Sequence, residues 1–276
     1  MIFYFSCTGN TLWAARKVAE ATGDSLINIA SLPYNVNDNV CNQHDSNHNV
    51  TYDFELKPGE SVGFFFPVHG WRPPLNVRRF ISKLRISNSH NHYCYAVCTA
   101  GDTVGEAMKI FEHDLSLIGI SLQSCISLIM PESYVGLPFM DVDTPQREAE
   151  KKHAADRRLA DFINDISNHT AGIRDLTIGN WPRINSRIIG SVFINQLITD
   201  RPFHVDANRC LHCGKCASVC PVGDIECNKG DLPTWLHNGT CLTCFSCYHH
   251  CPTKAISFGW RTKHKGQYYY EKRRNV

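Results

Sequence analysis

Short apolar stretches alternate with amphipathic helical patterns along the first 168 residues of the chain. The apolar stretches predict buried strands, because their aromatic and β-branched residues form short runs bounded by polar turn residues. We predict strands at 2–5, 25–29, 62–66, 93–98 and 122–129, and helices at 12–21, 75–84, 104–117 and 145–166. This alternation predicts an α/β fold with a doubly wound, parallel, five-stranded sheet.

The loops after the first, third and fourth predicted strands carry the polar and glycine residues of a candidate binding crevice. In a doubly wound sheet of strand order 2-1-3-4-5, ligands bind at the strand carboxyl ends beside the switch between strands 1 and 3. The first loop offers hydroxyls and backbone N–H groups at a helix N-terminus, which suits a phosphate. The candidate residues are Ser6, Cys7, Thr8, Gly9, Asn10, Thr11, His69, Gly70, Trp71, Thr99, Ala100, Gly101 and Asp102.

The first of these loops, residues 6–11, resembles the phosphate loop of flavodoxins, which holds the phosphate of FMN. The resemblance implies a flavodoxin-like FMN-binding domain over residues 1–168, with His69 or Trp71 covering one face of the flavin ring. Gly101 and Asp102 would then bond the ribityl chain or the ring edge. Residues 100–104 depart from flavodoxins, since they contain no aromatic side chain for the outer flavin face.

Each of these loops also has a purely structural interpretation. Asn10 or Thr11 could serve only as a helix N-cap, and Trp71 could pack on the two prolines that follow it. Thr103 and Glu106 have the spacing of a capping box, which competes with a ligand role for the adjacent Asp102. The chain has no G-x-G-x-x-G and no Gly-Lys-Ser/Thr ending, so neither a classical dinucleotide fold nor a P-loop is indicated.

Eight of the 14 cysteines form two runs of one spacing, C-x2-C-x2-C-x3-C-P. Three cysteines spaced in this way wrap a loop around one face of an iron-sulfur cube, and the fourth ligand then comes from the other run. We therefore predict two [4Fe-4S] clusters, the first held by Cys210, Cys213, Cys216 and Cys251, and the second by Cys241, Cys244, Cys247 and Cys220.

Zinc and disulfides are the alternatives for these cysteines. Structural zinc sites usually combine two C-x2-C pairs rather than two runs of three that end in Cys-Pro. A disulfide framework needs an oxidising compartment, and the opening residues have no secretory leader pattern, so we expect a cytoplasmic protein. Residues 203–258 resemble the bacterial two-cluster ferredoxins throughout, which implies a small α+β domain with a strand at 255–258.

Composition restricts the classes of partner. A net charge of +2 over 276 residues argues against nucleic acid as the main partner, because that role normally brings a strongly basic face. No apolar run approaches the roughly 18 residues that a membrane span needs. We therefore expect no membrane span, and a redox partner protein that the sequence does not identify.

Three segments lie outside these motifs. The polar insert 31–60 contains Cys41, His44 and His48, which predict a solvated loop more readily than a metal site. We predict that residues 169–202 form a connector with a short helix at 188–198. The tail 259–276 holds six of the Lys and Arg residues and three tyrosines, so it is either a solvated face or a docking site for an acidic partner or an ATP-like anion.

Taken together, the two resemblances imply a flavodoxin-ferredoxin fusion that transfers electrons between an external partner, two [4Fe-4S] clusters and FMN. FMN exchanges one or two electrons and each cluster exchanges one, so the fusion would connect these two kinds of carrier. One alternative is a ferredoxin carrier whose flavodoxin-like domain has lost flavin and serves as a docking module. Another is an FMN-dependent reductase of a small organic substrate.

Overall fold

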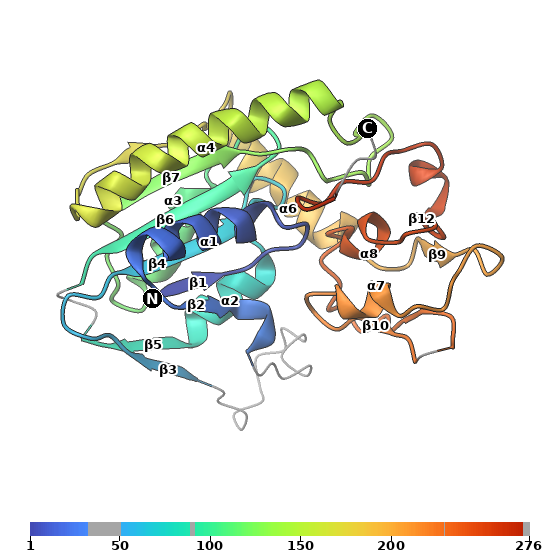
Figure 1. Cartoon of the computed structure of the whole chain (residues 1–276), viewed down its shortest axis with the longest axis horizontal. Coiled ribbons are helices and arrows are strands. Elements are labelled where there is room, and N and C mark those ends of the chain that lie inside the picture. Colours follow the sequence, from blue (N-terminus) through green and yellow to red (C-terminus); the bar gives the residue numbers. More distant parts are fainter. Residues whose placement is uncertain (33–50, 89–91, 229, 273–276) are drawn as a thin grey trace.

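The structure, a computed structural model, describes residues 1–32, 51–88, 92–228 and 230–272. A parallel sheet with strand order β2-β1-β4-β6-β7-β8 forms the centre of residues 1–175, which we call the α/β unit (Figure 1). Its strands are β1 (Ile2–Tyr4), β2 (Leu26–Asn28), β4 (Val62–Pro67), β6 (Cys94–Ala100), β7 (Ser124–Ile129) and β8 (Arg174–Asp175). The first five strands follow the predicted order 2-1-3-4-5, which confirms the doubly wound α/β prediction.

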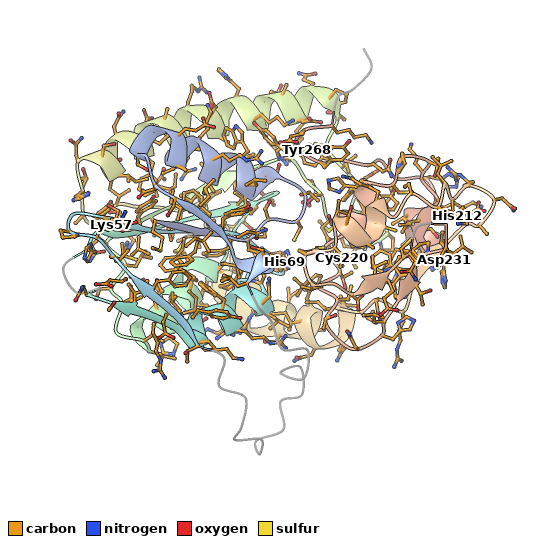
Figure 2. The ribbon with its side chains drawn as sticks, turned by 60° about the horizontal axis from the view of Figure 1, so that its bottom comes forward. Lys57, His69, His212, Cys220, Asp231 and Tyr268 are labelled. Atoms are coloured by element: carbon orange, nitrogen blue, oxygen red, sulfur yellow. The ribbon has the colours of Figure 1, made fainter. Side chains whose placement is uncertain are left out.

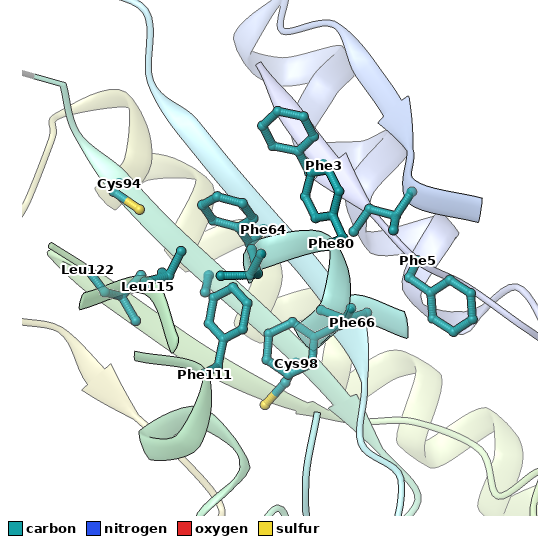
Figure 3. Close-up of a cluster of buried hydrophobic side chains, with 14 of the residues drawn as sticks. Phe3, Phe5, Phe64, Phe66, Phe80, Cys94, Cys98, Phe111, Leu115 and Leu122 are labelled. Atoms are coloured by element: carbon teal, nitrogen blue, oxygen red, sulfur yellow. The ribbon is translucent and has the colours of Figure 1, made fainter. Parts of the chain in front are cut away.

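Helices cover both faces of this sheet. On one face lie α1 (Asn10–Thr22) and α4 (Pro145–Ser167), and on the other α2 (Leu75–Lys83) and α3 (Ala107–Ser116). In α4 the buried positions Ala155, Leu159, Phe162 and Ile166 recur every three or four residues and therefore lie on one helical face. Figure 3 shows phenylalanines of β1, β4, α2 and α3 packed together on the opposite face of the sheet.

The sheet has one strand more than predicted. The sixth strand, β8, lies in the segment predicted to be only a connector, and Arg174 and Asp175 pair with Cys125 and Ile126 of β7. Its two residues are too few for a periodic pattern. A separate parallel pair joins β3 (Tyr52–Glu55) to β5 (Leu84–Ser87), so the end of the predicted insert is a strand rather than a loop. Cys41, His44 and His48 lie outside the described residues.

Residues 203–258, which we call the cluster unit, contain short elements around the two cysteine runs. An antiparallel pair joins β9 (Phe203–Val205) to β12 (Ile256–Phe258), and another joins β10 (Ile225–Glu226) to β11 (Thr234–Trp235). The helices α7 (Lys215–Ser218) and α8 (Ser246–His249) occupy corresponding places in the two runs. The strand predicted at 255–258 is confirmed as β12, whereas the boundaries 1–168, 169–202, 203–258 and 259–276 stay our prediction of the domains.

The remaining described segments connect the two units. Residues 182–197, here called the linking helix, comprise α5 (Pro182–Ile184), η4 (Asn185–Ile189), α6 (Gly190–Val192) and η5 (Phe193–Leu197). This helix begins six residues before its predicted start, directly after Trp181, because proline at the first helical position fits the fixed φ of a first turn. Two 3-10 turns, η1 (Ile29–Ser31) and η6 (Gly259–Thr262), complete the described elements.

The last described residues of the tail, 263–272, return to the α/β unit, and from here on the tail means these residues. In Figure 1 this red segment runs from η6 back toward α1 and α4. Tyr268 is only 2% exposed, and Tyr270 stacks on Trp13 of α1 with ring centroids 5.3 Å apart. The tyrosines of the tail are therefore packing residues at the junction of the units, which corrects the expectation of a solvated face for this part. Among the described residues, none of the helices is long and apolar enough to cross a membrane.

Candidate iron-sulfur and phosphate sites

The first predicted cluster site is a small cavity that opens to solvent. Its walls include the sulfur-bearing residues Cys210, Cys213, Cys216 and Cys251, the four ligands that the spacing predicts. Cys251 reaches this cavity from the second run, as the crossed pattern requires. Burial, and then the neighbouring Cys227 and Cys251 sulfurs, raise the pKa of Cys216 to about 12. The structure therefore brings the four predicted ligands of the first cluster to one cavity.

The four cysteines assigned to the second cluster also lie together. Burial, followed by the charges of Cys244, Cys241 and Cys220, raises the pKa of Cys247 well above its ordinary value. Burial and the charge of Cys244 likewise raise the pKa of Cys220 to about 11. A bound metal would favour the thiolate form of these cysteines, because its positive charge lowers the pKa of a thiol beside it. This set therefore fits the predicted second cluster.

The two sites face different surroundings. Figure 2 shows Cys220 on the side of the cluster unit nearest the α/β unit, whereas His212 of the first run lies on the far side. Leu242, in the second run, belongs to the apolar core that contains Phe5, Phe66 and Val104 of the α/β unit. The second run thus packs against the carboxyl end of the parallel sheet, where the sequence predicts the ligand crevice.

The loops of the predicted crevice meet as the strand order requires. The hydroxyls of Thr11 and Thr99 are 2.8 Å apart, and the Val68 N–H donates to the Thr99 carbonyl at 2.8 Å. The loops after β1, β4 and β6 therefore lie side by side. His69 is half-buried and burial lowers its pKa to about 4, so its imidazole is neutral near pH 7.

The side chains of the phosphate-like loop make contacts inside the protein. Thr8 Oγ1 donates to Ser133 Oγ at 3.3 Å, and Asn10 Nδ2 donates to the Pro131 carbonyl at 3.0 Å. Ser6 Oγ accepts from the Leu12 N–H at 3.2 Å. Helix α1 has Gly9 at its N-cap and no side-chain cap, so the N-cap roles considered for Asn10 and Thr11 are wrong.

The backbone N–H groups of this loop differ from its side chains in their hydrogen bonding. Within the described part of the chain, the N–H groups of Thr8, Gly9, Asn10 and Thr11 donate no backbone or side-chain hydrogen bond. Consecutive free N–H groups at a helix N-terminus are the donors that a phosphate uses. Of the two kinds of donor that the sequence predicted for a phosphate, the backbone N–H groups are therefore available, whereas the side chains of Ser6, Thr8 and Asn10 are engaged inside the protein.

Three glycines of the predicted crevice are closely covered by side chains of the protein. A Cβ added at Gly70 would meet the Phe193 ring of the linking helix at 2.7 Å, and one at Gly101 would meet the Glu132 carboxylate. A Cβ at Gly9 would lie 2.9 Å from Cβ of Tyr270 in the tail. A ligand that approached these glycines on the same side would have to displace the Phe193, Glu132 and Tyr270 side chains.

The other candidate residues have ordinary surroundings. The Trp71 indole N–H donates to Thr103 Oγ1 at 3.1 Å, and Glu106 pairs with Arg187 of the linking helix at 2.7 Å, so the predicted capping box does not form. The Ala100 carbonyl accepts from the Met130 N–H at 2.8 Å. The side chain of Asp102 is exposed.

A larger cavity, about 600 Å³ and open to solvent, lies between α2 and the segments that carry Cys220 and Leu242. Phe80 and Asn76 of α2 line one side, and Cys220, Val222 and Leu242 line the other. None of the residues predicted for the crevice contributes to its described lining. Among the described residues, no three Cys, His, Asp or Glu side chains converge closely enough to surround a single metal ion.

The sequence did not predict several residues of the crevice. Glu132 accepts from the N–H groups of Ser133 and Tyr134 at 2.8 and 2.7 Å, and burial raises the pKa of its carboxyl group. Tyr268 donates to Asn10 Oδ1 at 2.6 Å. The only sequence signal for Glu132 was its place in the loop after the predicted strand 122–129, and Tyr268 lies more than 250 residues from its partner.

Comparisons with known proteins give one family match, to the 4Fe-4S binding domain family Fer4_6, over residues 202–225. No curated protein matches the chain. Among solved structures, a Bacteroides uniformis protein described as a flavoprotein is 20% identical, with a TM-score of 0.31, and covers 46% of this chain and 88% of its own.

Two further structures belong to named oxidoreductases. An azoreductase from Bacillus anthracis is 11% identical, with a TM-score of 0.37 and coverage of 59% of this chain and 98% of its own. Rubredoxin oxygen:oxidoreductase from Desulfovibrio gigas is 16% identical, with a TM-score of 0.29, and the match covers 58% of this chain and 35% of that one. At these TM-scores the similarities support no conclusion about function. Any functional conclusion for this chain rests on the positions of its cysteines.

Proposed function

We propose that this chain is an electron-transfer protein that holds two [4Fe-4S] clusters and exchanges electrons with an external partner. The observation that carries the proposal is the crossed gathering of cysteines: Cys251 with the first run and Cys220 with the second. The family match over residues 202–225 supports it. Because such clusters exchange single electrons, we assign the chain to the oxidoreductases or their components.

The different surroundings of the two sites indicate which cluster would meet the external partner. The first site opens to solvent, and Cys213 and Leu211 beside it are exposed, so an external redox protein would approach there. The second site faces the α/β unit through Leu242. Electrons that arrive at the first cluster would then pass inward to the second.

We further propose that residues 6–11 hold the phosphate of FMN. The free N–H groups of Thr8 to Thr11 support this role, and a phosphate there would need no basic side chain. Bound FMN would supply a carrier of one or two electrons next to the second cluster site. The ring would need space that Phe193 and Glu132 now occupy.

The filled ring position favours a second candidate, a flavin-free carrier in which the α/β unit serves only as a docking module. In this case the contacts of Gly9, Gly70 and Gly101 are permanent, and the sheet only shields the second cluster. Both candidates share the two clusters. They differ in the flavin content of the purified protein.

Anaerobic purification followed by iron, sulfide and flavin analysis tests both points. Two complete ligand sets predict about eight iron and eight sulfide per chain. Stoichiometric zinc, or only two irons, would contradict the cluster proposal. Flavin fluorescence after acid denaturation separates the two candidates, and a titration then compares FMN with riboflavin. Binding through the phosphate predicts that FMN binds far more tightly, and equal affinities would reduce the loop to a structural turn.

A further inference from the structure

The cavity of about 600 Å³ between α2 and the segments that carry Cys220 and Leu242 lies apart from the crevice and from the first cluster site. Its volume is typical of sites that enclose small organic molecules, which measure roughly 300–1,000 Å³. The α/β unit contributes α2 and the turn η1 to the lining, and the cluster unit contributes residues 220–223. The cavity therefore lies at the junction of the two units, and neither unit would form it alone.

One face of α2 supplies most of the polar part of the lining. The lining residues of this helix recur at i, i+3, i+4 and i+7, the spacing of a single helical face, and they are Asn76, Arg79, Phe80 and Lys83. The Phe80 ring meets that of Tyr52, which also lines the cavity, with ring centroids 5.3 Å apart. An aromatic pair and two basic side chains therefore border the same space.

The charged side chains of this lining have one sign. Arg79 and Lys83 are basic, and in the described part of the chain neither Asp nor Glu lines the cavity. The neighbouring Arg78 is not part of this lining, and it pairs with Asp114 at 2.6 Å. Guanidinium and ammonium groups form charge-assisted hydrogen bonds with carboxylates and phosphates, so the cavity favours an anion.

Asn76 adds a polar group without a partner. Its Oδ1 atom is buried and accepts no hydrogen bond. A buried acceptor in this state destabilises the protein, because it has lost its bond to water and gained none. The last torsion of an amide side chain has broad preferences, so a rotation can turn Oδ1 toward a donor inside the cavity that Asn76 lines. The lining therefore suits an anion that also carries an N–H or O–H group.

The other side of the cavity borders the second cluster site. Cys220, a predicted ligand of that cluster, lines it together with the apolar side chains of Val222 and Leu242. Figure 2 shows Cys220 on the side of the cluster unit that faces the α/β unit. A molecule with its charged group at α2 would place its apolar part against these residues, and it would exclude water from this side of the second site.

We propose that this cavity binds a small aromatic anion, with the charged group at Arg79 and Lys83 and the aromatic part between Phe80 and Leu242. The bound anion would lie near Cys220, and its negative charge would lower the reduction potential of the second cluster, because reduction adds a further negative charge there. That consequence rests on the proposed function, whereas the binding itself does not. The cavity would thereby make the potential of one cluster respond to a small molecule.

Isothermal titration calorimetry of the anaerobically purified full chain tests the site. The probe is 6-hydroxy-2-naphthoate, which combines an aromatic body, a carboxylate and a hydroxyl donor, and 2-naphthol is its counterpart without the carboxylate. We expect the naphthoate to bind at about one molecule per chain. Arg79→Gln should weaken the naphthoate about tenfold and leave 2-naphthol unchanged, as expected for the loss of one charge-assisted hydrogen bond. Arg85→Gln removes the same charge from an exposed side chain outside the described lining, and it should change neither affinity.

A second variant tests the amide. Asn76→Leu keeps the approximate size of the side chain and removes the unpaired acceptor, so it should raise the melting temperature of the ligand-free protein. The same change should weaken both probes about fivefold, because both carry the hydroxyl. Asn76→Leu with unchanged affinities would overturn the role of this amide. Absence of saturable naphthoate binding, or equal affinities in Arg79→Gln and Arg85→Gln, would overturn the site itself.

EPR spectra and iron analysis separate this inference from the proposed function. In the reduced chain with about eight iron, saturating naphthoate should alter the signal of one cluster and leave that of the other. Two clusters whose signals both stay unchanged while the naphthoate binds would overturn its place beside Cys220. A chain that binds the naphthoate but contains no clusters would contradict the proposed function and leave the binding site intact.

Discussion

The two cysteine runs share one spacing but lie in opposite environments. Leu211 and Leu242 occupy the same position, directly after the first cysteine of each run, yet Leu211 is 63% exposed and Leu242 is 4% exposed. The first run borders a cavity open to solvent, and the second packs against Phe5 and Phe66 at the end of the sheet. Of the two runs, the first is therefore the outer one and the second is the inner one.

This difference separates two tasks that a single exposed cluster would have to combine. A cluster near the surface can meet a partner, whereas a cluster shielded from water has its potential set by fixed neighbours. The second run is held from the α/β unit by Cys7, whose carbonyl accepts from Ser246 Oγ, and from the tail by Tyr268, whose backbone N–H donates to His249 Nδ1. Four predictions test this contrast.

The largest effect is expected for the ligands themselves. Cys220→Ser removes a ligand of the inner cluster and should lower iron content from about eight to about four per chain, because an incomplete ligand set rarely retains its cluster. The matched variant is Cys227→Ser, whose sulfur lies near the outer site but outside both ligand sets. Iron and sulfide analysis provides the readout. Equal losses in both variants would contradict the crossed assignment.

The buried leucine should matter far more than its exposed counterpart. Leu242→Ala leaves a cavity in the shared apolar core and should cost about 2–5 kcal/mol, whereas Leu211→Ala should stay within about 0.5 kcal/mol. Each kcal/mol shifts the melting temperature of a chain this size by roughly 2–4 °C. Anaerobic thermal unfolding of the two variants measures the difference. If both variants melt together, the second run is not docked as described.

The pH dependence of stability should depend on His69, whose sequence neighbour Val68 packs against the same core as Leu242. Burial lowers the pKa of His69 to about 4, against about 6.5 in an unfolded chain. The unfolded chain therefore binds the extra proton between these values, and the contribution of neutral His69, complete above pH 6.5, is lost as the pH falls toward 4.

His69→Gln should reduce this acid destabilisation by about 2 kcal/mol, a value lowered to allow for the partial exposure of the ring. Melting temperatures at pH 7 and at about pH 5 provide the comparison, since much of the effect lies in that interval. The exposed His113 serves as the control in His113→Gln. A wild type and a His69→Gln variant with the same slope against pH would show that the ring is hydrated.

The smallest effects concern the tail that covers the inner region. Tyr268→Phe removes the bond to Asn10 and should cost about 1 kcal/mol, because Asn10 Oδ1 is then left buried with one donor fewer. Arg16→Ala removes an exposed ion pair with Glu271 and should change stability by less than about 0.5 kcal/mol. Thermal unfolding ranks the two. The opposite order would indicate that charge, rather than buried contact, holds the tail.

The sequence alone determined the parts whose signals are local. The spacing of the two cysteine runs predicted ligand sets that the structure gathers into two groups, including the exchange of Cys220 and Cys251. Apolar runs predicted the five strands, most clearly β4, β6 and β7, which are almost continuously buried, and the doubly wound fold class predicted their order. The strand β8 was missed, since its pairing with β7 depends on where the chain returns after α4.

Only the tertiary structure decided what covers the crevice. Phe193, Glu132 and Tyr270 come from three segments far apart in the chain, and nothing in their local sequence predicts that each meets a glycine of the crevice. The same holds for Cys7, a candidate binding residue of the phosphate-like loop, whose carbonyl accepts a hydrogen bond from Ser246 of the second cysteine run. Such contacts form between segments that are far apart in the chain, so no periodic pattern or motif spacing predicts them.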